Sequence, residues 1–230
     1  MNESHKDLVR TARVTGIWYL VLGISGVVGF LILNPKIFVS DDISKTVANL
    51  SEQETLARLR ILFEFAIVVS QALVAVYFFK LFKDINHFAA WALASWGMMN
   101  AGAIMISAMA MGGAVNVANA ALPASDKLIM IQIFDQFIQH SWGVGSLFFG
   151  LWLIPMGYIV VQSRRMPFWL GRILMAGGVG YIASTFFNYS GFDLSWVDFV
   201  TLPATIGEFW MIGYLLIFGI RPGKTGVQEG

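Results

Sequence analysis

Six long apolar segments, separated by short polar stretches, dominate the sequence. They cover residues 15–33, 61–79, 88–111, 140–161, 171–187 and 202–220. Each is close to the length of about 20 residues that an α-helix needs to cross the hydrocarbon core of a bilayer. The pattern therefore predicts an all-α fold, a polytopic membrane protein built as a bundle of six transmembrane helices.

The composition supports this prediction. Apolar residues make up 57% of the 230 residues and charged residues 13%, whereas a soluble domain carries about 25% charged residues. Six spans leave no room for a large soluble domain, so residues 1–230 are predicted to form a single transmembrane helical domain. The chain contains no Cys, which excludes disulfides, thiol catalysis and metal sites built on Cys.

Local signals mark where the first two predicted helices begin and end. Asn34-Pro35 predicts the end of the first helix, because proline disfavours helical geometry at the residue before it. A polar loop is expected over residues 36–50. Ser51 and Glu54 have the spacing of a capping box, which predicts that the second long helix begins there.

The distribution of basic residues predicts the orientation in the membrane. Six spans place both termini on one side, together with the turns near 80–87 and 162–172. That side holds ten basic residues and the other side five, so the positive-inside rule predicts that both termini are cytoplasmic. The connections around 34–60, 112–139 and 188–201 are expected to face outward. The ten basic residues are Lys6, Arg10, Arg13, Lys80, Lys83, Arg164, Arg165, Arg172, Arg221 and Lys224, and the five are Lys36, Lys45, Arg58, Arg60 and Lys127.

Polar and charged side chains recur inside the apolar spans. In hydrocarbon such groups are costly, so they normally face the bundle interior and find partners there. Helical periodicity places several of them on shared faces, toward the outward ends of their helices. We therefore expect a polar cavity that opens outward. The candidate cavity residues are Arg60, Glu64, Gln71, Asn100, Asp135, Gln139, His140, Tyr181, Asn188 and Glu208.

Each of these features also has a purely structural interpretation. Arg60 and Glu64 are four residues apart and can form an ion pair at a helix start. His140 can serve as a core histidine bonded to a neighbouring helix, and Glu208 can serve as a polar contact between helices. The polar residues around Asp135 are also typical of an amphipathic entry helix at the lipid headgroups.

Small residues in the fourth span favour close helix packing. Gly143, Ser146 and Gly150 lie on one face, and small side chains allow helix backbones to approach each other in a membrane. This stripe is therefore interpreted as a packing surface.

Several catalytic and cofactor motifs are absent from the sequence. The chain contains no GxxxxGK[ST] phosphate loop, no Gly-x-Ser-x-Gly nucleophile elbow and no pair of histidines four residues apart. No metal site, no cofactor and no nucleic-acid partner are expected. The expected partners are the lipid bilayer and a small molecule or lipid, and the sequence does not predict an oligomeric state.

The second half of the chain carries distinctive strings. They are HSWGVGSLFFGLWLIPMGY at residues 140–158, SRRMPFWLG at 163–171, GGVGY at 177–181 and the pair Gly207-Glu208. With these strings the chain resembles the bacterial six-span family catalogued as domain of unknown function 4386. The resemblance covers most of the chain and implies this fold and topology, in a bacterial inner (plasma) membrane. It brings no catalytic residue with it.

Three hypotheses about function follow. The first is a protein that binds or transports a small molecule or lipid through the outward-facing polar cavity. The second is a membrane-embedded enzyme in which Glu208, Asp135 or Glu64 acts as acid or base beside His140. The third is a structural or partner-binding subunit, in which the polar residues only join helices. The first two depend on whether Glu64, His140 and Glu208 converge on one site.

Overall fold

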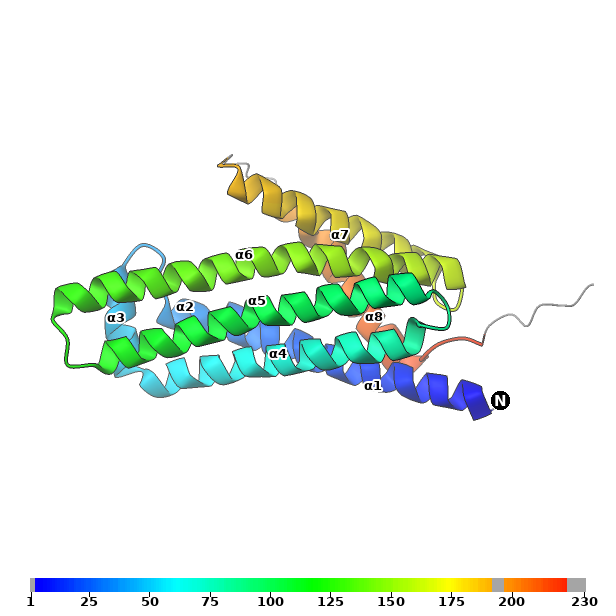
Figure 1. The fold of residues 1–230 in the computed structure, drawn as a ribbon, viewed down its shortest axis with the longest axis horizontal. Coiled ribbons are helices and arrows are strands. Elements are labelled where there is room, and N and C mark those ends of the chain that lie inside the picture. Colours follow the sequence, from blue (N-terminus) through cyan, green and yellow to red (C-terminus); the bar gives the residue numbers. More distant parts are fainter. Residues whose placement is uncertain (1–2, 192–196, 223–230) are drawn as a thin grey trace, which may run out of the picture. The chain divides into compact units, whose positions relative to one another are not determined.

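The computed structural model describes residues 3–191 and 197–222 of the chain. Within these ranges every regular element is a helix, so the predicted all-α fold is confirmed (Figure 1). Residues 192–196 of the predicted outward connection at 188–201, and Lys224 of the predicted cytoplasmic tail, lie outside the described residues. The elements are α1 (Glu3–Gly26), the π-helix η1 (Val27–Leu33), α2 (Asn34–Ile37), α3 (Ile43–Glu52), α4 (Glu54–Phe82), α5 (His87–Asn119), α6 (Ala124–Ser163), α7 (Phe168–Tyr189), the 3-10 helix η2 (Val197–Thr201) and α8 (Leu202–Ile217).

Among the described residues, six helical stretches are long and apolar enough to cross a membrane. This confirms the predicted multi-pass membrane protein. Several helices are longer than a bilayer requires. The helix α6, for example, has 40 residues and so measures about 60 Å at about 1.5 Å per residue. The six stretches are His5–Ile37, Glu54–Phe82, His87–Asn119, Ala124–Ser163, Phe168–Tyr189 and Phe199–Ile217.

The first helix does not end at Asn34-Pro35, so that prediction was wrong. The helix widens into the π-helix η1, continues as α2 and ends at Ile37, with Pro35 in the first turn of α2. The backbone N–H of Asn34 donates to the carbonyl of Gly29, five residues earlier. Proline lacks an N–H and its ring clashes with the preceding helical turn, and a wider turn just before it accommodates both effects.

The predicted polar loop at 36–50 contains the helix α3, and the predicted capping box was wrong. The side chain of Asp42 caps α3 by accepting a hydrogen bond from the backbone N–H of Lys45 at 2.9 Å. Ser51 lies in the last turn of α3, where its hydroxyl donates to the carbonyl of Val47 at 3.0 Å. The helix α3 forms because it buries Thr46 and Leu50 on one face.

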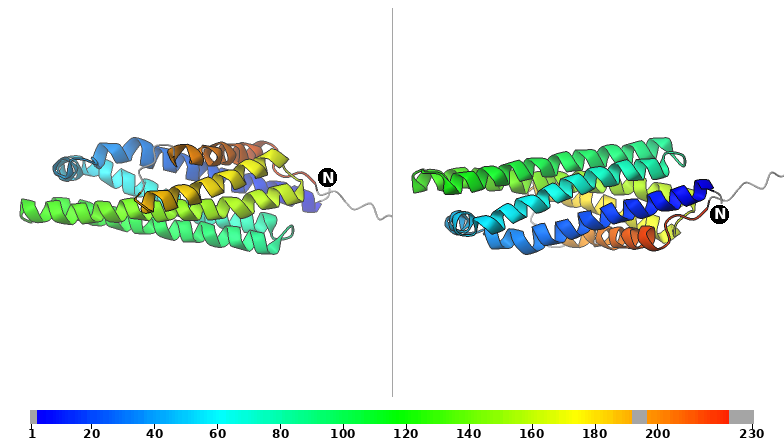
Figure 2. Two further views of the ribbon diagram at one scale, coloured as in Figure 1. Left: turned by 90° about the horizontal axis from the view of Figure 1, so that it is seen from above. Right: turned by 90° about the horizontal axis from the view of Figure 1, so that it is seen from below.

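The chain divides into two compact units. Unit 1 comprises Met1–Tyr19, Leu73–Gly97 and Ser146–Gly230, and unit 2 comprises Leu20–Ala72 and Met98–Gly145. Within unit 2, α3 runs crosswise to the long helices beside it (Figures 1 and 2). It covers an apolar core made of Ile37, Phe38, Leu50, Ala57, Ala110, Met111, Ala114, Val115, Val117, Ala118, Ile131 and Ile138.

Unit 1 is held together by close contacts at glycines. A Cβ added to Gly150 of α6 would lie 2.6 Å from the carbonyl oxygen of Gly178 in α7. A Cβ added to Gly177, on the same helix, would collide with the backbone of Ala204 in α8. Three helices therefore meet at small residues, as membrane helices commonly do.

Candidate functional site

A fully buried ion pair lies within unit 2. The Nη2 atom of Arg60 donates to Oε1 of Glu64 at 2.7 Å, and both side chains are fully buried. The same carboxylate oxygen also accepts hydrogen bonds from Ser107 Oγ at 3.0 Å and from Trp142 Nε1 at 3.1 Å. The carboxylate of Glu64 thus connects three helices, α4, α5 and α6.

Local sequence explains how a guanidinium fits inside a membrane bundle. Arg60 and Glu64 are one helical turn apart on α4, so their side chains meet on the same face. The residue opposite is Gly29 of the π-helix η1. A Cβ at Gly29 would lie 3.3 Å from Nη1 of Arg60 and 3.1 Å from Cβ of Phe63, so only a very small residue leaves room there.

Unit 2 buries more polar atoms than the described residues provide partners for. Arg60 Nε and Nη1, Glu64 Oε2, and both amide atoms of Gln71 and Asn100 have no hydrogen-bond partner among those residues. Gln71 and Asn100 are both buried. Gln71 follows Glu64 by seven residues on α4, and Asn100 precedes Ser107 by seven residues on α5. An unpartnered buried polar group costs about 1–3 kcal/mol. We call Arg60, Glu64, Gln71, Asn100 and Ser107 the buried polar cluster.

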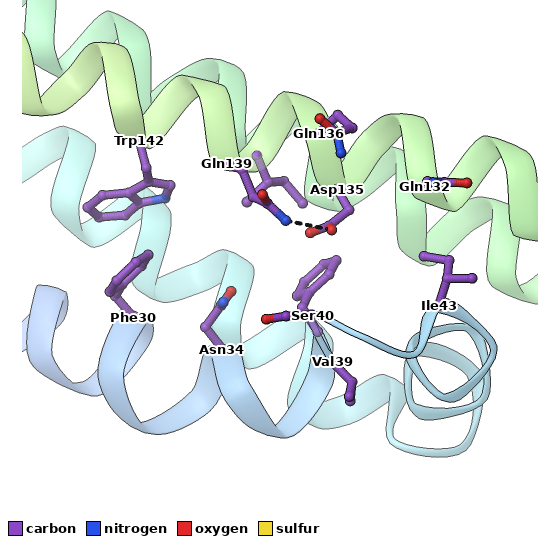
Figure 3. A pocket seen from close by; sticks show the side chains of 12 residues that line it. Phe30, Asn34, Val39, Ser40, Ile43, Gln132, Asp135, Gln136, Gln139 and Trp142 are labelled. Atoms are coloured by element: carbon purple, nitrogen blue, oxygen red, sulfur yellow. Dashed lines mark hydrogen bonds between the residues drawn. The ribbon is translucent and has the colours of Figure 1, made fainter. Parts of the chain in front are cut away.

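A pocket of about 500 Å³ opens in unit 2 between α6 and the stretch from η1 to the start of α3 (Figure 3). The side chains of Trp142, Gln139 and Asp135 in α6 project toward the facing segment (Figure 3). The walls combine amides, a hydroxyl, a carboxylate and aromatic rings. The lining residues are Phe30, Asn34, Phe38, Val39, Ser40, Ile43, Gln132, Asp135, Gln136, Ile138, Gln139 and Trp142.

Two aromatic rings form one wall of the pocket. The ring centroids of Phe30 and Trp142 are 4.7 Å apart, and Figure 3 shows the two rings facing each other. The indole N–H of Trp142 points to Glu64, so one side chain contacts both the pocket and the buried polar cluster. The orientation of this wall therefore depends on the buried ion pair.

The polar wall of the pocket contains one charge. Asp135 is the only residue with an ionisable side chain among the twelve that line it. Its Oδ2 atom accepts a hydrogen bond from Gln139 Nε2 at 2.7 Å (Figure 3). Across the pocket, Oδ1 of Asn34 is buried and lacks a donor among the described residues. The pocket thus offers one carboxylate, and an acceptor without a donor is buried at its wall.

Unit 2 contains seven of the ten candidate cavity residues. Asp135 and Gln139 line the pocket, while His140 is exposed and does not line it. Arg60, Glu64, Gln71 and Asn100 lie in the buried polar cluster.

The sequence reasoning missed Trp142, which it did not include among the cavity residues. Its spacing from Asp135 and Gln139 was the available signal, because residues three and seven positions apart share one face of a helix.

The other three candidates belong to unit 1. Glu208 of α8 is half-buried and accepts a hydrogen bond from the hydroxyl of Tyr19 at 2.7 Å. The ring of Tyr181 stacks on Phe149 with centroids 6.0 Å apart. Asn188 is exposed near the end of α7. In unit 1, Glu208 therefore has a hydroxyl as its hydrogen-bond partner.

The acidic residues and histidines do not form a metal site in the part of the chain that the structure describes. No group of three His, Asp or Glu side chains there is arranged to hold a metal ion. The chemistry of the pocket therefore consists of hydrogen bonding, one negative charge and aromatic contact.

Comparisons with known proteins give a family but no activity. A 69-residue stretch is 29% identical to a protein of Archaeoglobus fulgidus described as uncharacterized, and this match covers 30% of the chain and 43% of that protein. No solved structure matches the chain. The sequence profile described as "Domain of unknown function (DUF4386)" matches residues 14–219. These residues include all of unit 2 and most of unit 1, and the chain belongs to the DUF4386 family.

Proposed function

We propose that this membrane protein binds a small polar molecule in the pocket of unit 2. The observation that carries the proposal is the pocket itself, about 500 Å³ in volume, with polar walls and an aromatic wall bonded to a buried ion pair. Sites for small molecules typically measure about 300–1,000 Å³ and combine apolar or aromatic surface with a few fixed polar groups. The pocket has both properties.

The buried polar cluster supports a binding role. A buried charge pair seldom adds stability, because the loss of hydration offsets the attraction between the charges. Here the pair fixes the indole of Trp142, which is part of the pocket wall. A binding site benefits from such support, since a wall that is already ordered loses less freedom when the ligand binds.

A thermal-shift experiment tests the binding proposal. The purified protein is screened in detergent against small cationic, anionic and neutral polar compounds. Ser40 is exposed and lines the pocket, so Ser40→Trp fills it, whereas Ser125→Trp changes an exposed serine outside the pocket and serves as the control. Compounds that bind the pocket will stabilise the wild type and the control but not Ser40→Trp. If no compound separates Ser40→Trp from the control, the proposal is wrong.

We further propose that the protein lies in the cell inner (plasma) membrane with both termini in the cytoplasm and the pocket facing outward. The excess of basic residues near the termini and in the 80–87 and 162–172 turns supports this orientation. The pocket residues between Asn34 and Ile43 follow the first predicted span. Those between Gln132 and Gln139 belong to the N-terminal half of α6, on the side that this topology places outside.

The natural absence of cysteine makes the orientation simple to test, since each variant carries one thiol. Lys83→Cys and Ser125→Cys are both exposed positions. A membrane-impermeant maleimide is expected to label Ser125→Cys in intact cells and Lys83→Cys only after permeabilisation. The opposite result would reverse the topology, and labelling of both in intact cells would contradict it.

A further inference from the structure

The charge on the pocket wall sets the charge of its ligand. Asp135 supplies one negative charge, and none of the twelve lining residues is Lys, Arg or His. The buried cation of unit 2, Arg60, is already neutralised by Glu64 at 2.7 Å. An anionic ligand would therefore meet an uncompensated carboxylate, whereas a cation would gain a charge-assisted contact.

The aromatic wall favours a cation as well. The faces of aromatic rings carry negative electrostatic potential and attract ammonium groups. Phe30 is 40% exposed, and its ring stands against Trp142 at the pocket. The positive edge of the indole, its N–H, is bonded to Glu64. Trp142 therefore uses its N–H donor on the buried cluster and not on a ligand.

The hydrogen-bond acceptors indicate a cation that carries N–H groups. Asn34 lines the pocket, and its Oδ1 atom is buried without a donor among the described residues. Buried acceptors in folded proteins are satisfied by a protein group, water or a ligand. A primary ammonium group has three donors. They can serve Asp135 and, after a rotation of the Asn34 side chain that turns its oxygen into the pocket, Asn34 as well. A quaternary ammonium group has none.

We propose that the ligand of this pocket presents a primary ammonium group, held by Asp135, Asn34 and the Phe30–Trp142 wall. This inference rests on the proposed binding function and narrows its ligand class. The ammonium group can belong to a free amine or to the headgroup of an ethanolamine lipid, because both present the same chemistry to the pocket.

Calorimetric titration of the purified full-length protein with ethanolamine and with choline tests the ligand class. Ethanolamine is expected to bind at least several-fold more tightly than choline. Asp135→Asn, which preserves size and removes the charge, is expected to weaken ethanolamine binding about tenfold or more. Asp126→Asn makes the same change at an exposed position of α6 outside the pocket and is expected to leave the affinity unchanged.

A second variant keeps the test decisive if Asp135→Asn affects folding. Asn34→Leu removes the unpartnered acceptor and nearly preserves volume, so it is expected to weaken ethanolamine binding and leave choline unaffected. The proposal is overturned if choline binds as tightly as ethanolamine, or if Asp135→Asn binds ethanolamine like the wild type. It is also overturned if acetate or a neutral sugar binds in the pocket in place of the amine, although pocket binding itself would then stand.

The lipid environment distinguishes the two sources of the ammonium group. The ethanolamine titration is repeated in nanodiscs of phosphatidylethanolamine and of phosphatidylcholine. A lipid ligand will reduce the apparent affinity for ethanolamine only in phosphatidylethanolamine, while equal affinity in both indicates a free amine. Both results support the ammonium assignment. Absence of ethanolamine binding in both membranes and in detergent overturns it.

Discussion

The two units of the molecule differ in the polar groups that they bury. In unit 1 helices meet at glycines, where an added Cβ at Gly150 would lie 2.6 Å from a neighbouring carbonyl. Unit 2 instead buries an ion pair, together with Gln71 and Asn100, whose amides lack partners among the described residues. Close packing stabilises a membrane bundle directly, whereas buried polar groups are costly. The contrast supports the proposal that the binding site lies in unit 2.

The largest effect is expected from removing the carboxylate of the ion pair. Glu64→Leu leaves the guanidinium of Arg60 fully buried without its counter-charge, which costs about 3–5 kcal/mol of unfolding free energy. Arg60→Leu is expected to cost less, because a carboxyl group can take up a proton whereas a guanidinium stays charged. Denaturant unfolding of the purified variants in detergent measures both.

The double variant Arg60→Leu/Glu64→Leu provides the control for this pair. Replacing both charges by apolar groups is expected to recover most of the lost stability. A different result would be that Arg60→Leu is as destabilising as Glu64→Leu and that the double variant is less stable than either. The ion pair would then stabilise the fold, and the contrast between close packing in unit 1 and costly buried charges in unit 2 would disappear.

A smaller loss is expected from crowding the glycine contacts of unit 1. Gly177→Ala forces a methyl group against the backbone of Ala204 and is expected to lower the unfolding free energy by about 1–3 kcal/mol. Gly213 of α8 has open space around its Cβ position. Gly213→Ala is therefore expected to leave stability unchanged or raise it by up to about 1 kcal/mol. Equal effects of the two substitutions would refute close packing at Gly177.

The hydrogen bond in unit 1 is expected to contribute less. Tyr19→Phe removes the donor to Glu208, and a loss of about 1 kcal/mol in unfolding free energy follows. Tyr77, also in unit 1, has a hydroxyl without a hydrogen-bond partner in the described part of the chain, so Tyr77→Phe serves as the matched control. A loss of stability in Tyr77→Phe equal to that in Tyr19→Phe would show that the bond is not the cause.

The smallest effect is expected at the unpartnered amides of unit 2. Gln71→Leu replaces a buried amide that has no partner with an apolar side chain, so stability is expected to stay level or rise by up to about 1 kcal/mol. Ser107→Ala, by contrast, removes a bond to Glu64 and is expected to lower stability by about 1 kcal/mol. Thermal unfolding in detergent compares them, and a marked loss in Gln71→Leu would contradict the absence of a partner.

The sequence was sufficient to predict the helices because the signal for a membrane span is local. Long apolar runs specify the six membrane helices, and helical spacing predicts the Arg60–Glu64 contact. The end of the first helix was mispredicted because the effect of Pro35 depends on hydrogen bonding in the turn before it, which widened to a π-helix. The helix α3 was mistaken for a loop because it is short and its apolar face is buried by other helices.

The candidate site could be predicted only in part, because contacts between helices are not local. Periodicity places Asp135 and Gln139 on one face, and both line the pocket. It cannot show that Trp142, 78 residues after Glu64, donates to that carboxylate. Nor does it show that Tyr19 is the partner of Glu208, 189 residues away. Such pairs depend on how the helices pack.

The accessibility of a single cysteine in the pocket tests the account most directly. Ser40→Cys places one thiol among the exposed lining residues with little change in volume. In intact cells we predict that a membrane-impermeant maleimide labels it as rapidly as Ser125→Cys. Saturating ethanolamine should slow labelling severalfold at Ser40→Cys alone. Failure of Ser40→Cys to label from outside, or labelling at the same rate with and without ethanolamine, would contradict an outward-facing pocket that binds an ammonium ligand.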